Sequence, residues 1–177
     1  HQLSAITELK SAELVHWKNE RMGDGEILLR NPVFVALAQR FLAAPQDAPA
    51  REQLQAWLKA YLRFTSYDQI RLFDERGNVR LTVPEGRPPV SSTIANRIPD
   101  VLASRQVIFQ DFYRHDRDDR IYISVLVPLL DKRRAIGVLS LRIDPASYVY
   151  PLIKFWPTHS ATAETLLVRR EGNEVVY

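Results

Sequence analysis

The sequence contains no cysteine, which excludes disulfide bonds, thiol catalysis and cysteine metal sites. It also lacks the run of about 18 apolar residues that is needed to cross a bilayer. The chain begins at His1 without the basic and apolar segments of a signal peptide. Because it starts without methionine and ends within a strand-like run, we expect it to be a segment of a longer protein whose targeting and membrane segments lie elsewhere.

The sequence motifs of enzymes are missing as well. The six glycines are single, so no glycine-rich loop is available to cradle a phosphate, and no G-x-S-x-G or S-x-x-K motif marks a nucleophile. His115 and Asp116 are adjacent, but the histidines do not have the i, i+4 spacing of a helical metal site. We therefore predict no catalytic activity, no metal and no cofactor. A hydrolase built on His115 is an alternative that an assay of His115→Ala would test.

Charges of both signs are interleaved along the chain. It carries 24 Lys and Arg against 21 Asp and Glu, a net charge of +3, and no basic stripe is present of the kind that binds nucleic acid. A length of 177 residues with 46% hydrophobic residues suits one soluble domain, or one domain and a fragment of a second.

Hydrophobic periodicity divides the chain into a helical part and a strand-rich part. Helical spacing over 2–44 predicts a long helix, and Asn31-Pro32 predicts a break there, with asparagine as the N-cap of a second helix. Alternation begins after Tyr67. The further elements that we expect are a helix at 48–64, a hairpin at 69–83, a helix at 91–104, a strand at 107–112, a hairpin at 120–143, a helix at 145–155 and a final, truncated hairpin. This order predicts an α+β fold.

The hairpin at 120–143 has two different faces. One is aliphatic, and the other carries Tyr122 and Ser124 on the first strand and Ser140 and Arg142 on the second. We expect a register that places Leu129 opposite Ala135, Tyr122 opposite Arg142 and Ser124 opposite Ser140, with a loop of three to five residues. The polar face is either simply solvated or lines a cavity under the helix at 91–104 and the loop at 110–120. The large aliphatic residues on the same face favour a cavity.

The charged stretch RHDRDD, residues 114–119, precedes this hairpin. Its opposite charges are typical of an exposed loop in which neighbouring side chains neutralise one another. We therefore look for function in the residues that flank it rather than in the cluster itself.

Four stretches resemble the extracytoplasmic PAS-like sensor domains of the CACHE class, which are found on bacterial membrane-bound histidine kinases and diguanylate cyclases. The stretches are HWKNERMGDGEILLRNPVF, IRLFDERGNVRLTVPEG, FQDFYRHDRDDRIYISVLVPLLDKRRAIGVLSLRIDP and TAETLLVRREGNEVVY. The resemblance implies a PAS-like antiparallel sheet, with the long N-terminal helix packed on one face and a ligand pocket on the other. It also implies three parts: the helical segment 1–66, the sensor module 67–157, and a linker with the start of a second, membrane-proximal module at 158–177.

The resemblance implies ligand-binding roles on the polar face of the sheet. The residues concerned are Tyr113 in the loop, Arg120, Tyr122, Ser124, Arg142, and Phe73 as an apolar wall. Members that bind amino acids carry Arg and Trp before this loop, whereas Ser104-Arg105-Gln106 has no tryptophan, which does not favour an amino acid. Guanidinium and hydroxyl groups suit a carboxylate, so we expect a small organic anion.

The function implied is sensing at the extracytoplasmic (periplasmic) side of an inner-membrane receptor. A bound small molecule would shift the long N-terminal helix and so signal to a cytoplasmic output domain, most simply a histidine kinase of a two-component system. The alternative is a ligand-free module that pairs two copies, or a copy and a partner protein, through the N-terminal helix. We expect no nucleic-acid partner.

Overall fold

The structure is a computed structural model that describes residues 2–86, 89–155, 165–171 and 173–176. The chain forms two compact units, Lys18–Asp144 and the pair of segments His1–Trp17 and Pro145–Tyr177. Each unit is described by itself. Among the described residues, no helix combines the length and the apolarity needed to span a bilayer.

Three helices form the N-terminal part, as the periodicity predicts. They are α1 (Gln2–Leu29), α2 (Pro32–Ala43) and α3 (Ala48–Arg63). The Asn31 side chain accepts hydrogen bonds from two backbone N–H groups of the first turn of α2, at 3.1 and 3.0 Å. Asp47 caps α3 in the same way at 3.2 Å. These caps satisfy helix N–H groups that have no partner within the helix, so they explain where the chain breaks.

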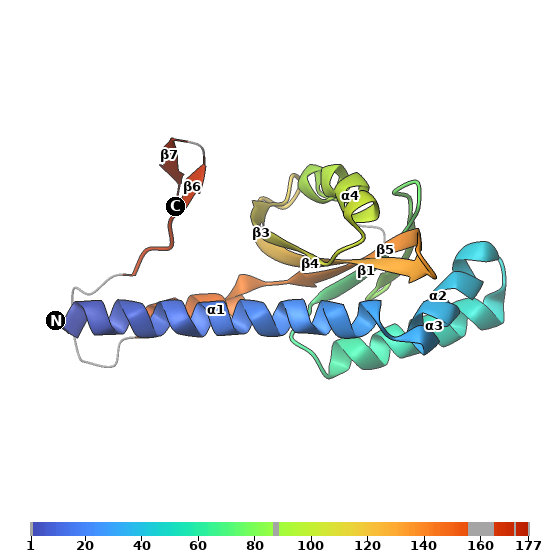
Figure 1. Cartoon of the computed structure of the whole chain (residues 1–177), viewed down its shortest axis with the longest axis horizontal. Helices are drawn as coiled ribbons and strands as arrows, with labels where there is room; N and C mark the ends of the chain where they lie inside the picture. The colour runs from blue at the N-terminus through green and yellow to red at the C-terminus, as the bar shows by residue number, and fades with distance from the viewer. Residues whose placement is uncertain (1, 87–88, 156–164, 172, 177) are drawn as a thin grey trace. The chain divides into compact units, whose positions relative to one another are not determined.

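The larger unit is built on a five-stranded antiparallel sheet with the strand order β2-β1-β5-β4-β3 (Figure 1). Its strands are β1 (Gln69–Asp74), β2 (Val79–Val83), β3 (Ile108–Arg114), β4 (Ile121–Asp131) and β5 (Arg134–Ile143). Helix α4 (Ser92–Ser104) connects β2 to β3 and covers one face of the sheet (Figure 1). The expected α+β fold, with its long N-terminal helix and antiparallel sheet, is confirmed.

The expected register of the central hairpin is wrong by two residues. Ser124 lies opposite Arg142, and Leu129 lies opposite Gly137 rather than Ala135. The loop is shorter than expected because Lys132 adopts a left-handed conformation with φ 57°, which allows a two-residue turn. A bulge after Leu129 shifts the register by one residue, so that Leu130 lies opposite Ala135. Since a shift of two keeps every side chain on its own face, the two predicted faces survive the error.

The aliphatic face of β4 packs against the part of α1 that belongs to the larger unit. Gly25 makes this approach possible: a Cβ added there would lie 2.6 Å from a methyl group of Val107, 3.1 Å from one of Val125 and 3.2 Å from one of Val127. These valines are buried. Gly25 therefore lowers the intrinsic stability of the helix but lets the helix backbone lie directly on the sheet.

The smaller unit contains a short 3₁₀ turn, Pro145–Ser147, followed by α5 (Val149–Lys154). The continuous helix expected at 145–155 is therefore interrupted near Tyr148. The Tyr148 ring stacks on Trp17 with the ring centroids 5.8 Å apart, and Lys10 Nζ donates to the carbonyl of Ile153 at 2.6 Å.

The expected terminal hairpin is formed by β6 (Arg169–Glu171) and β7 (Glu174–Val176). Residues 156–164, which include the start of the linker expected within 158–177, lie outside the described residues.

Candidate functional site

The candidate site lies between the polar face of the sheet and α4. Phe73, Tyr113, Tyr122 and Ser124 are buried there, and Arg142 is half-buried. Aliphatic residues of the sheet and of α4 pack around the aromatic ones: Ile94, Ile98, Val101, Leu126 and Val138. The polar face is therefore covered rather than solvated, and five of the six site residues predicted from the sequence come together on it.

Tyr113 reaches this face from a strand and not from a loop, which corrects the expectation. It lies near the end of β3, opposite Tyr122, after a bulge that follows Gln110. Its hydroxyl and the Ser124 Oγ are 2.9 Å apart and share a hydrogen bond. Burial raises the pKa of the Tyr113 phenol, so at neutral pH the group is a neutral donor and acceptor.

Arg142 is held by one carboxylate and one aromatic ring. Its Nε and Nη2 donate to the two carboxylate oxygens of Asp68 at 3.0 and 2.6 Å, and its Cζ lies 4.1 Å from the centroid of the Tyr122 ring. Burial opposes the charge of the guanidinium, but the bonds to Asp68 outweigh burial and raise the pKa of Arg142. Arg142 is thus a fixed, charged donor at the edge of the site.

Arg120 lies further out than predicted. Its side chain is 59% exposed and pairs with Asp144 at 2.6 Å, although its guanidinium still lies 5.5 Å from the centroid of the Tyr122 ring. Arg120 therefore stands beside the site and is not part of its buried lining.

A cavity of about 10 Å³, room for about one water molecule, lies among the polar groups. It is lined by Gln69, Arg71, Ser91, Ile94, Tyr113, His115, Ser140 and Arg142. Two guanidinium groups, two hydroxyls of serine, a phenol and an imidazole therefore converge on one small space. The described residues that line it include no carboxylate.

Arg71 is the main site residue that the sequence reasoning missed. It is 6% exposed, lies opposite Ser140 in the sheet, and donates from Nη1 to the carbonyl of Pro89 at 3.1 Å. Burial and the neighbouring charge of Arg142 both lower its pKa. The signal was present, because Arg71 lies two positions before Phe73 and so must share its face.

Ser91 Oγ and His115 Nδ1, both on the cavity wall, are among the buried polar atoms that have no hydrogen-bond partner within the described residues. Asp118 Oδ1 lies 3.2 Å from that nitrogen, close enough for an ion pair but without the alignment of a hydrogen bond. The other ring nitrogen of His115 lies 3.2 Å from the carbonyl of Pro89. Buried polar groups are normally satisfied, so these atoms are available to a polar guest.

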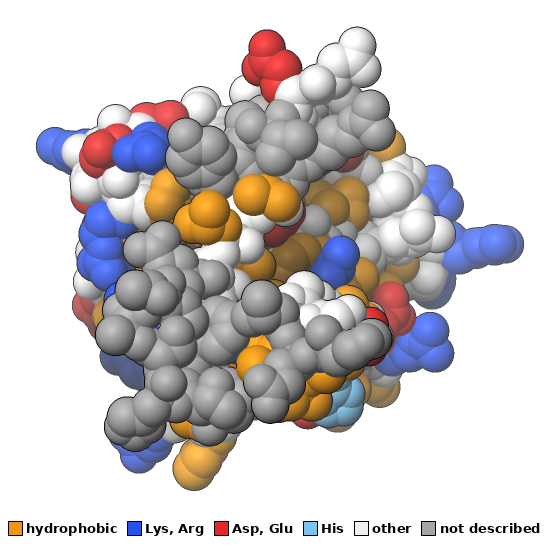
Figure 2. All heavy atoms as spheres, turned by 90° about the vertical axis from the view of Figure 1, so that its left-hand side faces the viewer, with side chains coloured by type: hydrophobic (Ala, Val, Ile, Leu, Met, Phe, Trp, Pro, Cys, Tyr) orange, Lys and Arg blue, Asp and Glu red, His pale blue; other side chains and the backbone are white. Residues whose placement is uncertain are grey.

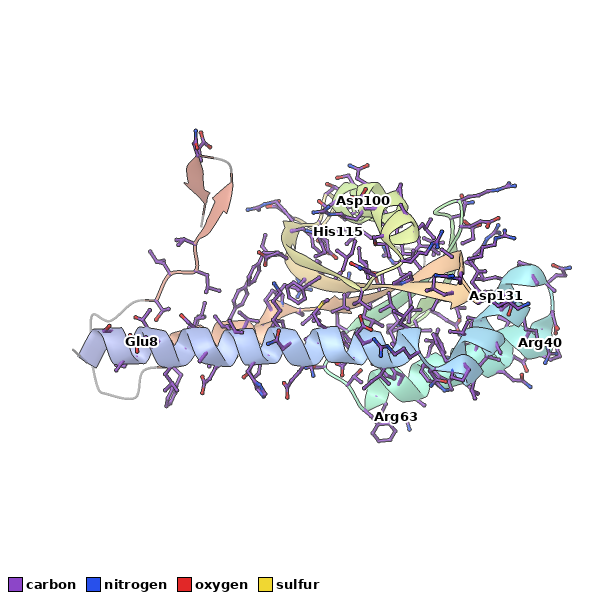
Figure 3. The ribbon with its side chains drawn as sticks, in the orientation of Figure 1. Glu8, Arg40, Arg63, Asp100, His115 and Asp131 are labelled. Atoms are coloured by element: carbon purple, nitrogen blue, oxygen red, sulfur yellow. The ribbon has the colours of Figure 1, made fainter. Side chains whose placement is uncertain are left out.

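The turn between β3 and β4 closes the site at one side, and this corrects the expectation of a wholly exposed charged loop. His115 is 5% exposed and points to the α4 side of the sheet, whereas Asp131 marks the opposite end of β4 (Figure 3). Asp116 accepts hydrogen bonds from the backbone N–H of Ser92, at the start of α4, and from its hydroxyl at 2.9 Å. The predicted neutralisation within the loop is confirmed for Arg114 and Asp119, which pair at 2.9 Å.

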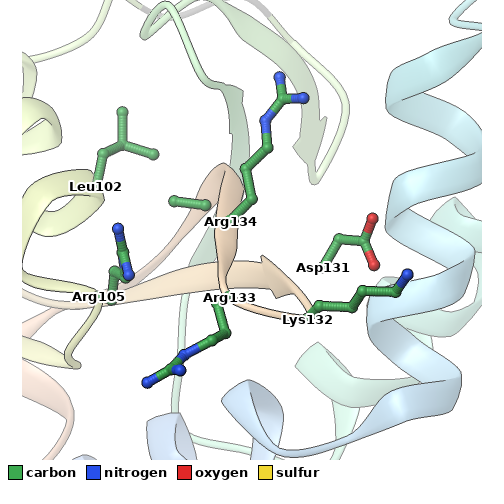
Figure 4. A pocket seen from close by; sticks show the side chains of 7 residues that line it. Leu102, Arg105, Asp131, Lys132, Arg133 and Arg134 are labelled. Atoms are coloured by element: carbon green, nitrogen blue, oxygen red, sulfur yellow. The ribbon is translucent and has the colours of Figure 1, made fainter.

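A second, open hollow of about 560 Å³ lies at the turn between β4 and β5 (Figure 4). Its residues are Leu102, Arg105, Asp131, Lys132, Arg133, Arg134 and Ala135. Arg134 already pairs with Glu75 at 2.7 Å, and Asp131 accepts from the amide of Gln39 at 2.8 Å. The hollow is basic but shallow, and it contains none of the predicted site residues.

Charge is otherwise dispersed. On the face shown in Figure 2, Lys and Arg side chains are spread around the outline and interspersed with Asp and Glu. Within the described part of the chain, no three His, Asp or Glu side chains are grouped closely enough to hold a metal ion.

Comparisons with known proteins bear on the fold. No family model matches the chain, and no curated protein matches it in sequence. The sensor domain of the Vibrio cholerae histidine kinase DctB is similar in structure, with a TM-score of 0.67 at 12% identity, over 82% of this chain and 56% of that one. The ligand-binding domain of the Pseudomonas fluorescens chemoreceptor CtaA, in complex with L-alanine, has a TM-score of 0.59 at 14% identity, over 86% of this chain and 62% of that one.

The ligand-binding domain of the Pseudomonas aeruginosa amino-acid chemoreceptor PctC, in complex with GABA, has a TM-score of 0.60 at 16% identity, over 87% of this chain and 67% of that one. The chain thus spans a little over half to two thirds of the length of these domains. At this level of identity the likeness concerns the fold alone. The chain has the PAS-like fold of sensor domains of histidine kinases and chemoreceptors, as its resemblance to the CACHE class implied.

Proposed function

We propose that this chain is the extracytoplasmic sensing part of a transmembrane receptor and that it binds a small organic anion between the sheet and α4. The observation that carries the proposal is the pair of guanidinium groups, Arg71 and Arg142, on one small buried cavity. Hydroxyls of Tyr113 and Ser140 complete a set of donors suited to a carboxylate.

The charges of the cavity favour an anion over a neutral guest. Arg71 and Arg142 repel one another in a place that water reaches poorly, and an added carboxylate lowers that repulsion. The ligands in the similar solved structures, L-alanine and GABA among them, each carry a carboxylate. This supports an anionic group on the ligand and leaves the rest of its structure open.

Ligand entry requires the site to open, since a space of about 10 Å³ does not hold a molecule larger than water. The contacts that close it are those between Asp116 and Ser92 and between His115 and Pro89. We infer that the ligand selects a state in which the β3–β4 turn or α4 has moved away. Binding then shifts the population towards that state, and α1 passes the change to an output domain, most simply a histidine kinase.

The proposed layout of the parent protein follows the same reasoning. Residues 1–66 would connect the sensor to the membrane, 67–157 would hold the ligand, and 158–177 would begin a second, membrane-proximal module. The sensing part would then lie in the periplasm.

Calorimetric titration of the chain with acetate, succinate, GABA and L-alanine tests the anion site, with acetamide and succinamide as neutral counterparts. We expect at least one carboxylate to bind and its amide to fail. Arg71→Gln and Arg142→Gln should each weaken binding by about tenfold or more, the cost of a lost charge-assisted bond. Arg134→Gln, at the other end of the sheet, is the matched control. Binding that survives both site substitutions would place the ligand elsewhere.

A ligand-free pairing module is the second candidate, because α1 exposes apolar side chains. Leu9 and Val15 are 57% and 58% exposed. If two copies pair through this helix, Leu9→Ser should shift the sedimentation coefficient from that of a dimer to that of a monomer. If the wild-type chain and Leu9→Ser are both monomeric at high concentration, this candidate is ruled out.

A further inference from the structure

We propose that Asp68 is a built-in competitor for the ligand: its carboxylate occupies Arg142, and an anionic ligand signals by displacing it. The proposal rests on the anion site described above and adds how that site is regulated. Asp68 thereby links occupancy of the cavity to α1, through the neighbouring Tyr67.

The pair between Asp68 and Arg142 has the geometry of a bound carboxylate. Two nitrogens of the guanidinium meet two oxygens at 3.0 and 2.6 Å, the arrangement in which arginine recognises carboxylate ligands. Arg142 also lines the cavity, whereas Asp68 does not. Because Asp68 already takes Nε and Nη2, a carboxylate that enters from the cavity and binds the same edge of the guanidinium must displace it.

The Asp68 side chain can rotate away without directly breaking the hydrogen bond between its backbone and β5, although the segment then loses a side-chain anchor. Its backbone N–H donates to the carbonyl of Arg142 at 3.0 Å, and this bond does not involve the side chain. The Asp68 side chain is 32% exposed, while that of Arg142 is 17% exposed. The carboxylate can thus rotate into water, where it is well solvated, while the guanidinium stays in place for the ligand.

The residue before Asp68 is anchored to α1. The Tyr67 hydroxyl donates to Asp24 Oδ2 at 2.7 Å, and Arg21 Nε lies 3.0 Å from the same oxygen. Tyr67 is 4% exposed, and its ring stacks on Tyr61 with the centroids 6.2 Å apart. A change at Asp68 is therefore one residue away from a buried contact with the helix that would carry the signal.

The other carboxylates near the site are less suited to this role. Asp144 pairs with Arg120, which lies outside the lining of the cavity. Asp118 accepts from the neutral hydroxyl of Tyr122 at 3.1 Å and lies 3.2 Å from Nδ1 of the cavity-lining His115, but both partners are outside the segment that contacts α1. Among the ion pairs of the described residues, the one between Asp68 and Arg142 joins a cavity-lining cation to the segment that contacts α1.

Two competing groups must weaken each other by the same factor, so removing one strengthens the other. The first test is titration of wild-type chain and Asp68→Asn with acetate and succinate. We expect the variant to bind about tenfold more tightly, within the usual range of coupling between sites. Glu75→Gln makes the same change of charge at the exposed pair with Arg134, and it should leave the affinity unchanged.

The second test uses the wild-type chain, so it does not depend on the folding of a variant. Hydrogen–deuterium exchange is followed by mass spectrometry with and without saturating succinate. Displacement of Asp68 should speed exchange in peptides covering 64–70 and 18–29, while peptides covering 48–58 serve as the internal reference. Tyr67→Phe should keep the affinity for succinate and abolish the response in 18–29.

The outcomes separate the two proposals. If neither wild-type chain nor Asp68→Asn binds acetate or succinate, the anion site itself is wrong, and the competitor with it. If wild-type chain binds but Asp68→Asn binds no more tightly, or exchange at 64–70 is unchanged by succinate, the anion site stands and the competitor is overturned. Tighter binding by Asp68→Asn together with faster exchange supports both.

Discussion

Two glycines in α1, two residues apart, should respond in opposite directions to the same substitution. A Cβ added at Gly23 would meet no atom within 4 Å, whereas one added at Gly25 would overlap Val107 and press on two further valines. We expect Gly23→Ala to stabilise the chain and Gly25→Ala to destabilise it. The prediction tests directly whether α1 lies on the aliphatic face of the sheet.

The magnitudes follow from two opposing terms. Replacing glycine by alanine within a helix favours folding by about 0.8–1 kcal/mol at either position. At Gly25 the new methyl group lies 2.6 Å from a β-branched side chain with little rotamer freedom, and overpacking of a core typically costs about 1–3 kcal/mol. Because the helix term is common to both variants, the difference between them measures the overlap alone, about 1–3 kcal/mol.

Thermal and urea unfolding, each followed by circular dichroism, measure that difference. For a chain of this size, 1 kcal/mol corresponds to about 2–4 °C in Tm. We expect the Tm of Gly23→Ala to lie above that of the wild-type chain and the Tm of Gly25→Ala to lie below it, while the slope of unfolding free energy against urea concentration stays unchanged. Equal stabilisation by both substitutions would show that the helix does not approach the sheet at Gly25, and the packing inferred for this face would be refuted.

Three further predictions concern the larger unit. Burial raises the pKa of Asp74, but hydrogen bonds from the backbone and side chain of Asn78 and from Arg76 and Arg80 outweigh burial, so the net pKa is lowered. The stability that these bonds confer is present above the usual Asp range and is lost as pH falls through the lowered pKa. Asp74→Ala should therefore cost about 1–3 kcal/mol of unfolding free energy at pH 7 and make the fall in stability with acid less steep. Burial, then Asp24, raises the pKa of Tyr61 to about 12, so the stability that its protonated phenol contributes is complete below pH 10 and is lost as pH rises towards 12. Absorbance at 295 nm should show this phenol ionising later than the exposed ones, and Tyr61→Phe should reduce the late-ionising amplitude by one phenol. Gly137→Ala would drive a methyl group into the carbonyl of Phe73, which cannot move within its strand, and urea unfolding should show a loss of about 3 kcal/mol or more.

The sequence was sufficient for the faces of the sheet and insufficient for its register. Alternation places Tyr122, Ser124 and Arg142 on one side whatever the pairing, because any even shift preserves the faces. The two-residue turn depends on Lys132 in a left-handed conformation, which a lysine rarely adopts, so nothing in the residue types announces it.

The partners of the site residues were beyond prediction because they come from distant parts of the chain. Asp68 and Arg142 are separated by 74 positions, and Asp116 and Ser92 by 24. Periodicity describes one element at a time, so it does not tell which carboxylate reaches which cation. Arg71 is a different case, since the alternation that selected Phe73 selects it too, and the omission was one of reasoning rather than of information.

The partners of these residues also explain why the site is closed. Arg142 is bound by Asp68, Tyr113 by Ser124 and Tyr122 by Asp118, so a ligand must exchange existing bonds for its own. Such exchange contributes little net free energy. The repulsion between Arg71 and the half-buried Arg142 is a different matter: Asp68 bonds to Arg142 from outside the cavity lining, whereas a carboxylate in the cavity would face both guanidinium groups and lower the repulsion further. The free energy of binding would therefore come mainly from charge, which is why neutral amides of the same shape should fail.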